Sequence, residues 1–234
     1  SPILYFKKIQ YLVESENLEF DELIIFLDIS DIPDEYYYNQ NFANDEIKKE
    51  FRDVVQEFLL KNVSTYLFLD LVFAKLASFK ELSIIRIKAA KEFNKSFLDT
   101  SIKEINLYKS INVERGNWTH DELYWNLHGN KGRELANHNL VKLYNLCIKN
   151  NIKFSLVIYP WPNQIYYDQE SKRHRKYWKN WAEDRNIKFI DLFNYFNQGE
   201  PIQIIEKYFI PGDIHWNKKG HIFVSNILEK EYFN

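Results

Sequence analysis

Methionine is absent from all 234 residues of this chain, even from position 1, and the sequence opens abruptly on Ser1-Pro2. We therefore expect the sequence to be part of a longer protein. Cysteine is almost absent too: Cys147 stands alone, and a lone cysteine excludes an internal disulfide. Long apolar runs are also lacking. Tyr66–Ala77 is interrupted by Asp70 and Lys75, and no run approaches the ~20 residues that a membrane span needs, so we predict no span in this sequence.

The chain also lacks an excess of charge of either sign. It has 31 basic and 33 acidic residues, a net charge of −2, which gives no general reason to bind nucleic acid. One basic segment, Lys172–Lys176, precedes Tyr177, Trp178 and Trp181 and has the composition of an RNA-binding helix. In a near-neutral chain we interpret it as a solvated basic face over an apolar stripe. We predict no nucleic-acid partner, and an RNA-binding domain is the least favoured alternative.

Hydrophobic residues are plentiful at 45%, and aromatics reach 17%, so the chain can fold around a sizeable core. We predict a single domain over residues 1–234 with a helical insertion at about residues 46–97, where apolar residues recur at helical spacing. Helices that simply cover one face of a sheet would explain this pattern equally well. The polar residues 99–119 that follow are predicted to form a lid-like connection.

Strand and helix patterns alternate along the rest of the chain. The expected strands are Leu23–Leu27, Lys153–Tyr159 and Ile187–Asp191, and the expected helices are Pro2–Val13, Lys131–Lys149 and Ser171–Arg185. Alternation at this spacing predicts βαβ units and a parallel sheet. The continuous apolar run Leu23–Leu27 predicts a strand buried on both faces. Cys147 lies on the apolar side of its helix and is predicted to be a core residue rather than a nucleophile.

Polar loops follow the predicted strands at Asp28–Glu35 and Tyr159–Pro162, and Pro211–Asn217 forms a third. In open α/β sheets ligands bind at the carboxyl ends of the strands, so we expect these loops to meet there. In the third loop Asp213 and His215 lie two residues apart, which in extended chain puts both side chains on one side. A carboxylate that orients an imidazole is half of a Ser-His-Asp apparatus. A local hydrogen-bonded turn would give the same spacing.

Four segments, in order along the chain, resemble the SGNH (GDSL-like) hydrolase superfamily. Ser1-Pro2 is similar to the residues after the second block of that superfamily, and Leu23–Asp31 to its Gly-x-Asn-Asp block. Tyr159–Pro162 resembles the strand end before the last helices. Asp213–Asn217 resembles the last block, and its short Asp-x-His-Trp spacing is similar to the branch that contains alginate O-acetylation proteins.

The resemblance implies a three-layer α/β sandwich with a mostly parallel, flavodoxin-like sheet, in which His215 is the general base and Asp213 orients it. Two departures from the family pattern stand out. Ser30 occupies the position of the asparagine that donates to the oxyanion, and we assign that role to its hydroxyl. No Gly-Asp-Ser block precedes it, so we expect the nucleophile and its strand to lie in upstream sequence.

Other residues of the same predicted edge are candidates for substrate binding. Trp161 and Trp216 could stack on a sugar, although packing in the core or at the rim explains them equally well. Asp31 is a third candidate. His221 with His215 and Asp213 lacks the spacing of a zinc helix motif, so we predict no metal.

These features predict a serine-dependent ester hydrolase or O-acyltransferase, acting on acetyl esters of a small carbohydrate or a polysaccharide without a metal or organic cofactor. The alternative is a non-catalytic, glycan-binding relative that lacks the nucleophile. No export signal is visible, and a periplasmic or cell-envelope location is implied by the resemblance alone.

Overall fold

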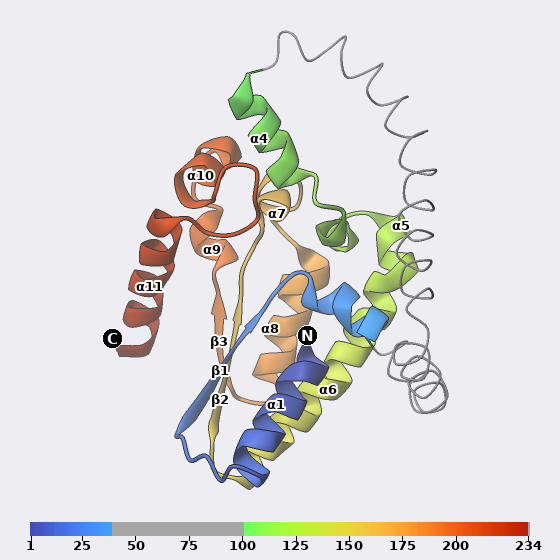
Figure 1. Cartoon of the computed structure of the whole chain (residues 1–234), viewed down its shortest axis with the longest axis vertical. Coiled ribbons are helices and arrows are strands. Elements are labelled where there is room, and N and C mark those ends of the chain that lie inside the picture. Colours follow the sequence, from blue (N-terminus) through green and yellow to red (C-terminus); the bar gives the residue numbers. More distant parts are fainter. Residues whose placement is uncertain (39–100, 234) are drawn as a thin grey trace, which may run out of the picture. The chain divides into compact units, whose positions relative to one another are not determined.

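The computed structural model of the chain describes residues 1–38 and 101–233, so the helical insertion predicted at residues 46–97 lies outside the described residues. Apart from residues 101 and 102, the described residues belong to one compact unit, Ser1–Asn39 with Lys103–Asn234 (Figure 1). Its elements are α1 (Pro2–Glu14), β1 (Glu22–Leu27), a helix described over residues 31–38, α4 (Ile102–Ile111), the 3₁₀ helix η1 (Glu114–Thr119), α5 (Glu122–Tyr124), the π-helical turn η2 (Trp125–Gly129), α6 (Asn130–Lys149), β2 (Lys153–Ile158), α7 (Pro162–Tyr167), the π-helical turn η3 (Lys172–Lys176), α8 (Tyr177–Glu183), β3 (Lys188–Asp191), α9 (Phe193–Phe196), α10 (Pro201–Tyr208) and α11 (Lys218–Phe233).

The three strands form a parallel sheet in the order β1-β2-β3 (Figure 1). Leu27 of β1 pairs with Ile158 of β2, which pairs with Asp191 of β3, so all three strands end at the same edge. Parallel neighbours need crossover connections, and α6 and α8 supply them before β2 and β3. The predicted α/β class and parallel sheet are confirmed.

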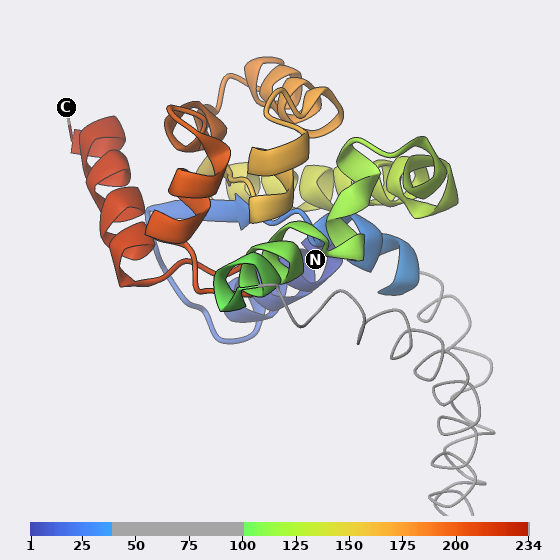
Figure 2. The same cartoon turned by 90° about the horizontal axis from the view of Figure 1, so that it is seen from above.

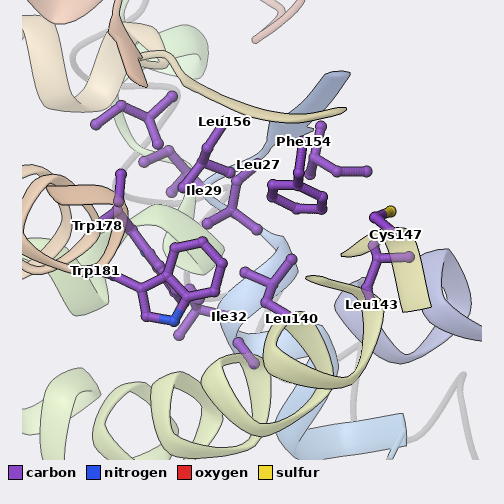
Figure 3. Packing of buried hydrophobic residues seen from close by; sticks show 14 of the residues in the cluster. Leu27, Ile29, Ile32, Leu140, Leu143, Cys147, Phe154, Leu156, Trp178 and Trp181 are labelled. Atoms are coloured by element: carbon purple, nitrogen blue, oxygen red, sulfur yellow. The ribbon is translucent and has the colours of Figure 1, made fainter. Parts of the chain in front are cut away.

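Hydrophobic clusters lie on both faces of this sheet, because successive side chains of a strand point to opposite faces. Leu156 of β2 is fully buried in the first cluster, with Leu27, Leu140 of α6 and Trp178 of α8 (Figure 3). Cys147 belongs to the same cluster, and burial raises the pKa of its thiol to about 11. This agrees with the predicted core role, since a thiol that stays protonated at neutral pH is a poor nucleophile.

The second cluster contains the neighbouring residue Val157, with Ile190 of β3, Ile205 of α10 and Val224 of α11. Figures 1 and 2 accordingly show α6 and α11 on opposite sides of the sheet. Fully burying one such aliphatic side chain contributes about 1.5–3 kcal/mol to folding, so two clusters hold the strand ends in fixed positions.

Strand β1, an edge strand among the described strands, is less buried than predicted. Ile25 and Leu27 are buried, at 7% and 0% exposure, but Ile24 is 40% exposed. The prediction of burial on both faces is therefore wrong for β1. The reason is its place in the sheet: β1 pairs with β2 alone among the described strands, and the face that carries Ile24 is incompletely covered there.

Two segments predicted as irregular connections are largely helical. After β1, only Asp28, Ile29 and Ser30 form a turn before the helix of residues 31–38 begins. The predicted lid at residues 99–119 contains α4 and η1, and Ile111 at the end of α4 is buried in the second cluster. Both segments are rich in polar residues, so their helical periodicity is weak, and contacts with the rest of the fold decide their structure.

Within the described ranges, none of the helices combines the length and apolar character that crossing a membrane requires.

Candidate functional site

The three predicted loops meet around one cleft at the carboxyl edge of the sheet. The cleft has a volume of about 350 Å³. Its lining residues come from the turn after β1, from η1, from the segment after β2, from the loop before α11 and from the first turn of α11: Asp28, Ser30, Arg115, Tyr159, Trp161, Ile214, His215, Trp216 and His221. The place of the cleft agrees with the rule that α/β sheets bind ligands at their carboxyl ends.

Asp213 and His215 form the predicted pair in the loop between α10 and α11. Nδ1 of His215 lies 2.6 Å from Oδ1 of Asp213, and that hydrogen bond lowers the pKa of the Asp213 carboxyl below its usual value. The same oxygen accepts the backbone N–H of Ile214 at 2.6 Å. Among the described residues Nε2 of His215 has no hydrogen-bond partner, and 74% of the side chain is exposed. The carboxylate therefore orients the ring and leaves its second nitrogen open to a reacting group.

Local contacts fix the shape of this loop. Gly212 adopts a φ of +79°, a left-handed conformation that favours glycine, within a turn that is closed by a bond from the N–H of Asp213 to the carbonyl of Ile210. Beyond the loop, Oδ1 of Asn217 accepts the N–H groups of Lys219 at 2.8 Å and Gly220 at 3.0 Å. Asn217 is thus the N-cap of α11.

Asp28, the first residue after β1, accepts four hydrogen bonds in the wall of the cleft. Oδ1 accepts the N–H and the hydroxyl of Ser30, at 2.7 and 2.6 Å. Oδ2 accepts Nε1–H of Trp161 at 2.9 Å and the hydroxyl of Tyr159. Burial, followed by the charge of Asp28, raises the pKa of Tyr159 far above its ordinary value, so this hydroxyl stays protonated. Asp28 is consequently a carboxylate whose acceptor positions are filled.

This arrangement bears on the predicted role of Ser30 in binding an oxyanion. A hydroxyl has one proton to donate, and the proton of Ser30 is directed at Asp28. Its backbone N–H is directed at the same oxygen. Ser30 lines the cleft as expected, but neither of its donors is left for a ligand.

Asp31, predicted as a substrate contact, is not among the residues that line the cleft. It is 4% exposed, and its carboxylate accepts the hydroxyl of Tyr5 at 2.7 and 2.9 Å and the N–H of Asp28 at 2.8 Å. Burial raises the pKa of Asp31 to about 6. Asp31 therefore supports the cleft indirectly, because its carboxylate accepts the N–H of Asp28, which lines the cleft.

The two tryptophans of the cleft differ in accessibility. Trp161 is 3% exposed, so little of its ring can stack on a sugar, and its indole N–H is committed to Asp28. Trp216 is half-buried and packs against Tyr159, with ring centroids 4.9 Å apart. Trp216 is the better of the two candidates for stacking, because part of its ring remains accessible.

Arg115 and His221 also line the cleft, and neither was assigned to a site from the sequence. The guanidinium of Arg115 pairs with the carboxylate of Asp34 in the helix that follows β1. Arg115 lies in the polar stretch interpreted as a lid, where no strand or helix pattern links it to the sheet edge. The imidazole of His221 lies edge-on to Trp216, with ring centroids 5.7 Å apart.

The basic segment Lys172–Lys176 is largely neutralised within the fold. Three of its cations form ion pairs: Lys172 with Glu170, Arg173 with Glu122, and Arg175 with Asp191. His174 is fully buried, and burial lowers its pKa to about 3. The geometry gives no support to the RNA-binding alternative, because phosphate contacts need cations that are free to meet them.

No group of three or more His, Cys, Asp or Glu side chains in residues 1–38 and 101–233 is arranged to hold a metal ion. Comparisons of the chain with protein-family models, with curated proteins and with solved structures found no match. The functional argument therefore depends on the geometry of the cleft.

Proposed function

We propose that the protein is a serine-dependent ester hydrolase or O-acyltransferase that acts on acetyl esters of carbohydrates. The observation that carries this proposal is the 2.6 Å contact between Nδ1 of His215 and Oδ1 of Asp213. His215 lines the cleft, and its Nε2 has no hydrogen-bond partner among the described residues. A base within reach of a cleft, oriented by a carboxylate, is the arrangement that activates a hydroxyl nucleophile.

In the first step the nucleophile's oxygen attacks the ester carbonyl carbon, and its proton passes to Nε2 of His215. The π electrons of the carbonyl move to its oxygen, which becomes an oxyanion. When this intermediate collapses, the bond to the sugar oxygen breaks and that oxygen takes the proton from His215. An acyl-enzyme and a free sugar hydroxyl result. In the second step water, or the hydroxyl of an acceptor sugar, attacks the carbonyl carbon of the acyl-enzyme and gives its proton to His215. The bond to the serine oxygen then breaks, that oxygen takes the proton from His215, and the acyl group leaves on water or on the acceptor.

We place the nucleophile on a further strand that pairs with the outer edge of β1. Two observations support this: β1 has one partner among the described strands, and Ile24 on it is 40% exposed. A parallel strand added there would end beside Asp28, at the rim of the cleft. With that strand the fold would be the three-layer, SGNH-like sandwich, and the aggregation-prone edge of β1 would be covered.

The aromatic side of the cleft supports a carbohydrate as the ester's alcohol part. Trp216 and Tyr159 form a partly accessible aromatic surface next to His215. Aromatic faces pack against the apolar faces of sugar rings, whereas the Asp213–His215 pair handles the polar ester group.

The test uses the full-length protein, a fluorophosphonate that labels activated serines, and p-nitrophenyl acetate as substrate. The wild-type protein should form one covalent adduct and release p-nitrophenol, and His215→Ala should lose both activities. His138→Ala is the matched control, because His138 is an exposed histidine of α6 that does not line the cleft.

Adduct formation and hydrolysis that persist in His215→Ala would refute the proposal. A wild-type protein that forms no adduct but binds acetylated oligosaccharide in calorimetry would instead support the glycan-binding alternative. That outcome predicts loss of binding in Trp216→Ala, since Trp216 offers the accessible ring.

A further inference from the structure

The oxyanion formed on the substrate needs hydrogen-bond donors, and three side-chain donors of the cleft are already engaged by Asp28. Stabilisation of this kind comes from preorganised N–H or O–H groups aimed at the oxygen where charge develops. In this cleft the hydroxyls of Ser30 and Tyr159 and the indole N–H of Trp161 all point at Asp28. Redirecting any of them would leave the Asp28 carboxylate short of a partner, which costs more than a single hydrogen bond returns.

Arg115 differs from these residues in both charge and spare capacity. A guanidinium carries five N–H donors, and the described contacts of Arg115 use its Nη2 for Asp34. The side chain is 55% exposed and lines the cleft together with His215. Among the described residues that line the cleft, it is the one lysine or arginine side chain.

The ion pair with Asp34 also holds Arg115 in place. Asp34 belongs to the helix that begins directly after the β1 turn, and its side chain is 22% exposed. The backbone of Arg115 is fixed by η1, where the N–H of Gly116 donates to the carbonyl of Val113 at 2.9 Å. A cation anchored at both ends is preorganised, which is the property that makes a donor effective in a transition state.

We propose that Arg115 is a catalytic residue that stabilises the oxyanion of the substrate, in the role that the family resemblance implies for Ser30. This assignment depends on the proposed acyl-transfer function. A remaining N–H of the guanidinium donates to the carbonyl oxygen as its charge grows, and no proton is transferred in that contact. When the intermediate collapses, the electron pair returns to the carbonyl and the hydrogen bond weakens.

A surface ion pair without a catalytic role makes a different prediction. Exposed pairs contribute little to stability, so a purely structural Arg115 could be removed with little effect on folding or on activity. A catalytic Arg115 could also be removed with little effect on folding, but the turnover number would fall strongly. The decisive measurement is therefore the turnover number of a variant whose melting temperature is unchanged.

The experiment compares Arg115→Ala and Arg115→Lys in the full-length protein, with p-nitrophenyl acetate as substrate. We expect Arg115→Ala to lower kcat by about 10²-fold with KM changed less than about threefold, the size that removal of one oxyanion donor gives. Arg115→Lys should recover part of this loss, because an ammonium keeps the charge but not the forked geometry. Lys131→Ala, which removes an exposed cation paired with Glu134, should behave like wild type.

The outcomes separate this inference from the proposed function. If Arg115→Ala keeps kcat within about twofold of wild type while His215→Ala is inactive, the oxyanion role of Arg115 is wrong and the role of His215 as general base is retained. A rise in KM at constant kcat would also overturn the role, since it indicates ground-state binding. If His215→Ala is as active as wild type, the proposed function fails, and the assignment of Arg115 fails with it.

Discussion

Two acidic turns lie at the same edge of the sheet, and their surroundings are opposite. In the turn after β1, Asp28 accepts four hydrogen bonds, and Asp31 at the start of the next helix is 4% exposed. In the loop before α11, the side chain of Asp213 is 44% exposed and that of His215 is 74% exposed. The first turn has satisfied its hydrogen-bonding capacity inside the protein, whereas the second keeps one imidazole nitrogen for a partner from outside.

This difference separates structural support from chemistry at one site. Polar groups that satisfy each other become rigid, and they gain little from a ligand. An imidazole nitrogen that is held in a fixed orientation, with its lone pair free, can accept a proton, which is what a general base must do. We infer that the β1 turn builds the cleft and that the loop of Asp213 and His215 reacts in it. Substitutions in the first should mainly change stability, and substitutions in the second should mainly change activity.

The largest expected effect is on activity, in Asp213→Asn. An asparagine amide can donate to Nδ1 of His215, which places the ring proton on Nε2 and removes its capacity as a base. We expect kcat for p-nitrophenyl acetate to fall on the order of 10³-fold, with the free energy of unfolding within about 0.5 kcal/mol of wild type. Steady-state kinetics and urea denaturation test the two parts. A variant that retains more than about a tenth of kcat would show that the Asp213 contact is a local turn.

The next effect is on stability, in Asp28→Ala. The change leaves the hydroxyls of Tyr159 and Ser30 and the indole N–H of Trp161 without their acceptor. Each buried donor that loses its partner costs about 1–3 kcal/mol, so we expect destabilisation of about 3–5 kcal/mol in urea denaturation. Asp213→Ala is the matched control, because that carboxylate is half exposed, and it should cost less than about 1 kcal/mol. Equal losses in the two variants would contradict the division between the turns.

The sequence predicts the strand ends and the Asp213–His215 pair of this site better than the long-range contacts that line the cleft. Strand ends can be located from apolar runs such as Leu23–Leu27. The spacing of Asp213 and His215 indicates their contact, but the contact forms in a bend where Oδ1 of Asp213 also accepts the N–H groups of Ile214 and His215, not in extended chain. Both features are local. The contact between Arg115 and Asp34 joins residues 81 positions apart, and that between Trp161 and Asp28 joins residues 133 apart. No local pattern encodes such pairs, because they depend on how the crossovers bring the strand ends together.

The same limit explains why Ser30 and Asp31 were assigned to the ligand. Their position after an apolar strand is typical of site residues, and the sequence alone does not show that Tyr5 and Asp28 occupy their polar atoms. The exposure of Ile24 has a related explanation. A run of apolar residues predicts a strand but does not show whether that strand lies in the centre or at the edge of the sheet, which depends on the strand order.

The smallest effect, and the one specific to pH, concerns Asp31. Burial raises its pKa in the folded protein to about 6, above the ordinary 3.8, so the folded state holds this proton more tightly than the unfolded state does. The stability that this group contributes is complete below about pH 4, declines as pH rises through 6, and is constant above that. Asp31→Asn removes the titration and keeps an oxygen that can accept from Tyr5. The free energy of unfolding of the variant relative to wild type should therefore rise by about 2 kcal/mol between pH 4 and pH 7. Urea denaturation of both proteins at several pH values measures this difference, in which titrating groups that do not interact with Asp31 cancel. A difference that does not change with pH would mean that Asp31 is ionised in the fold at acidic pH, and that the β1 turn is less closed to solvent than the comparison with the Asp213 loop requires.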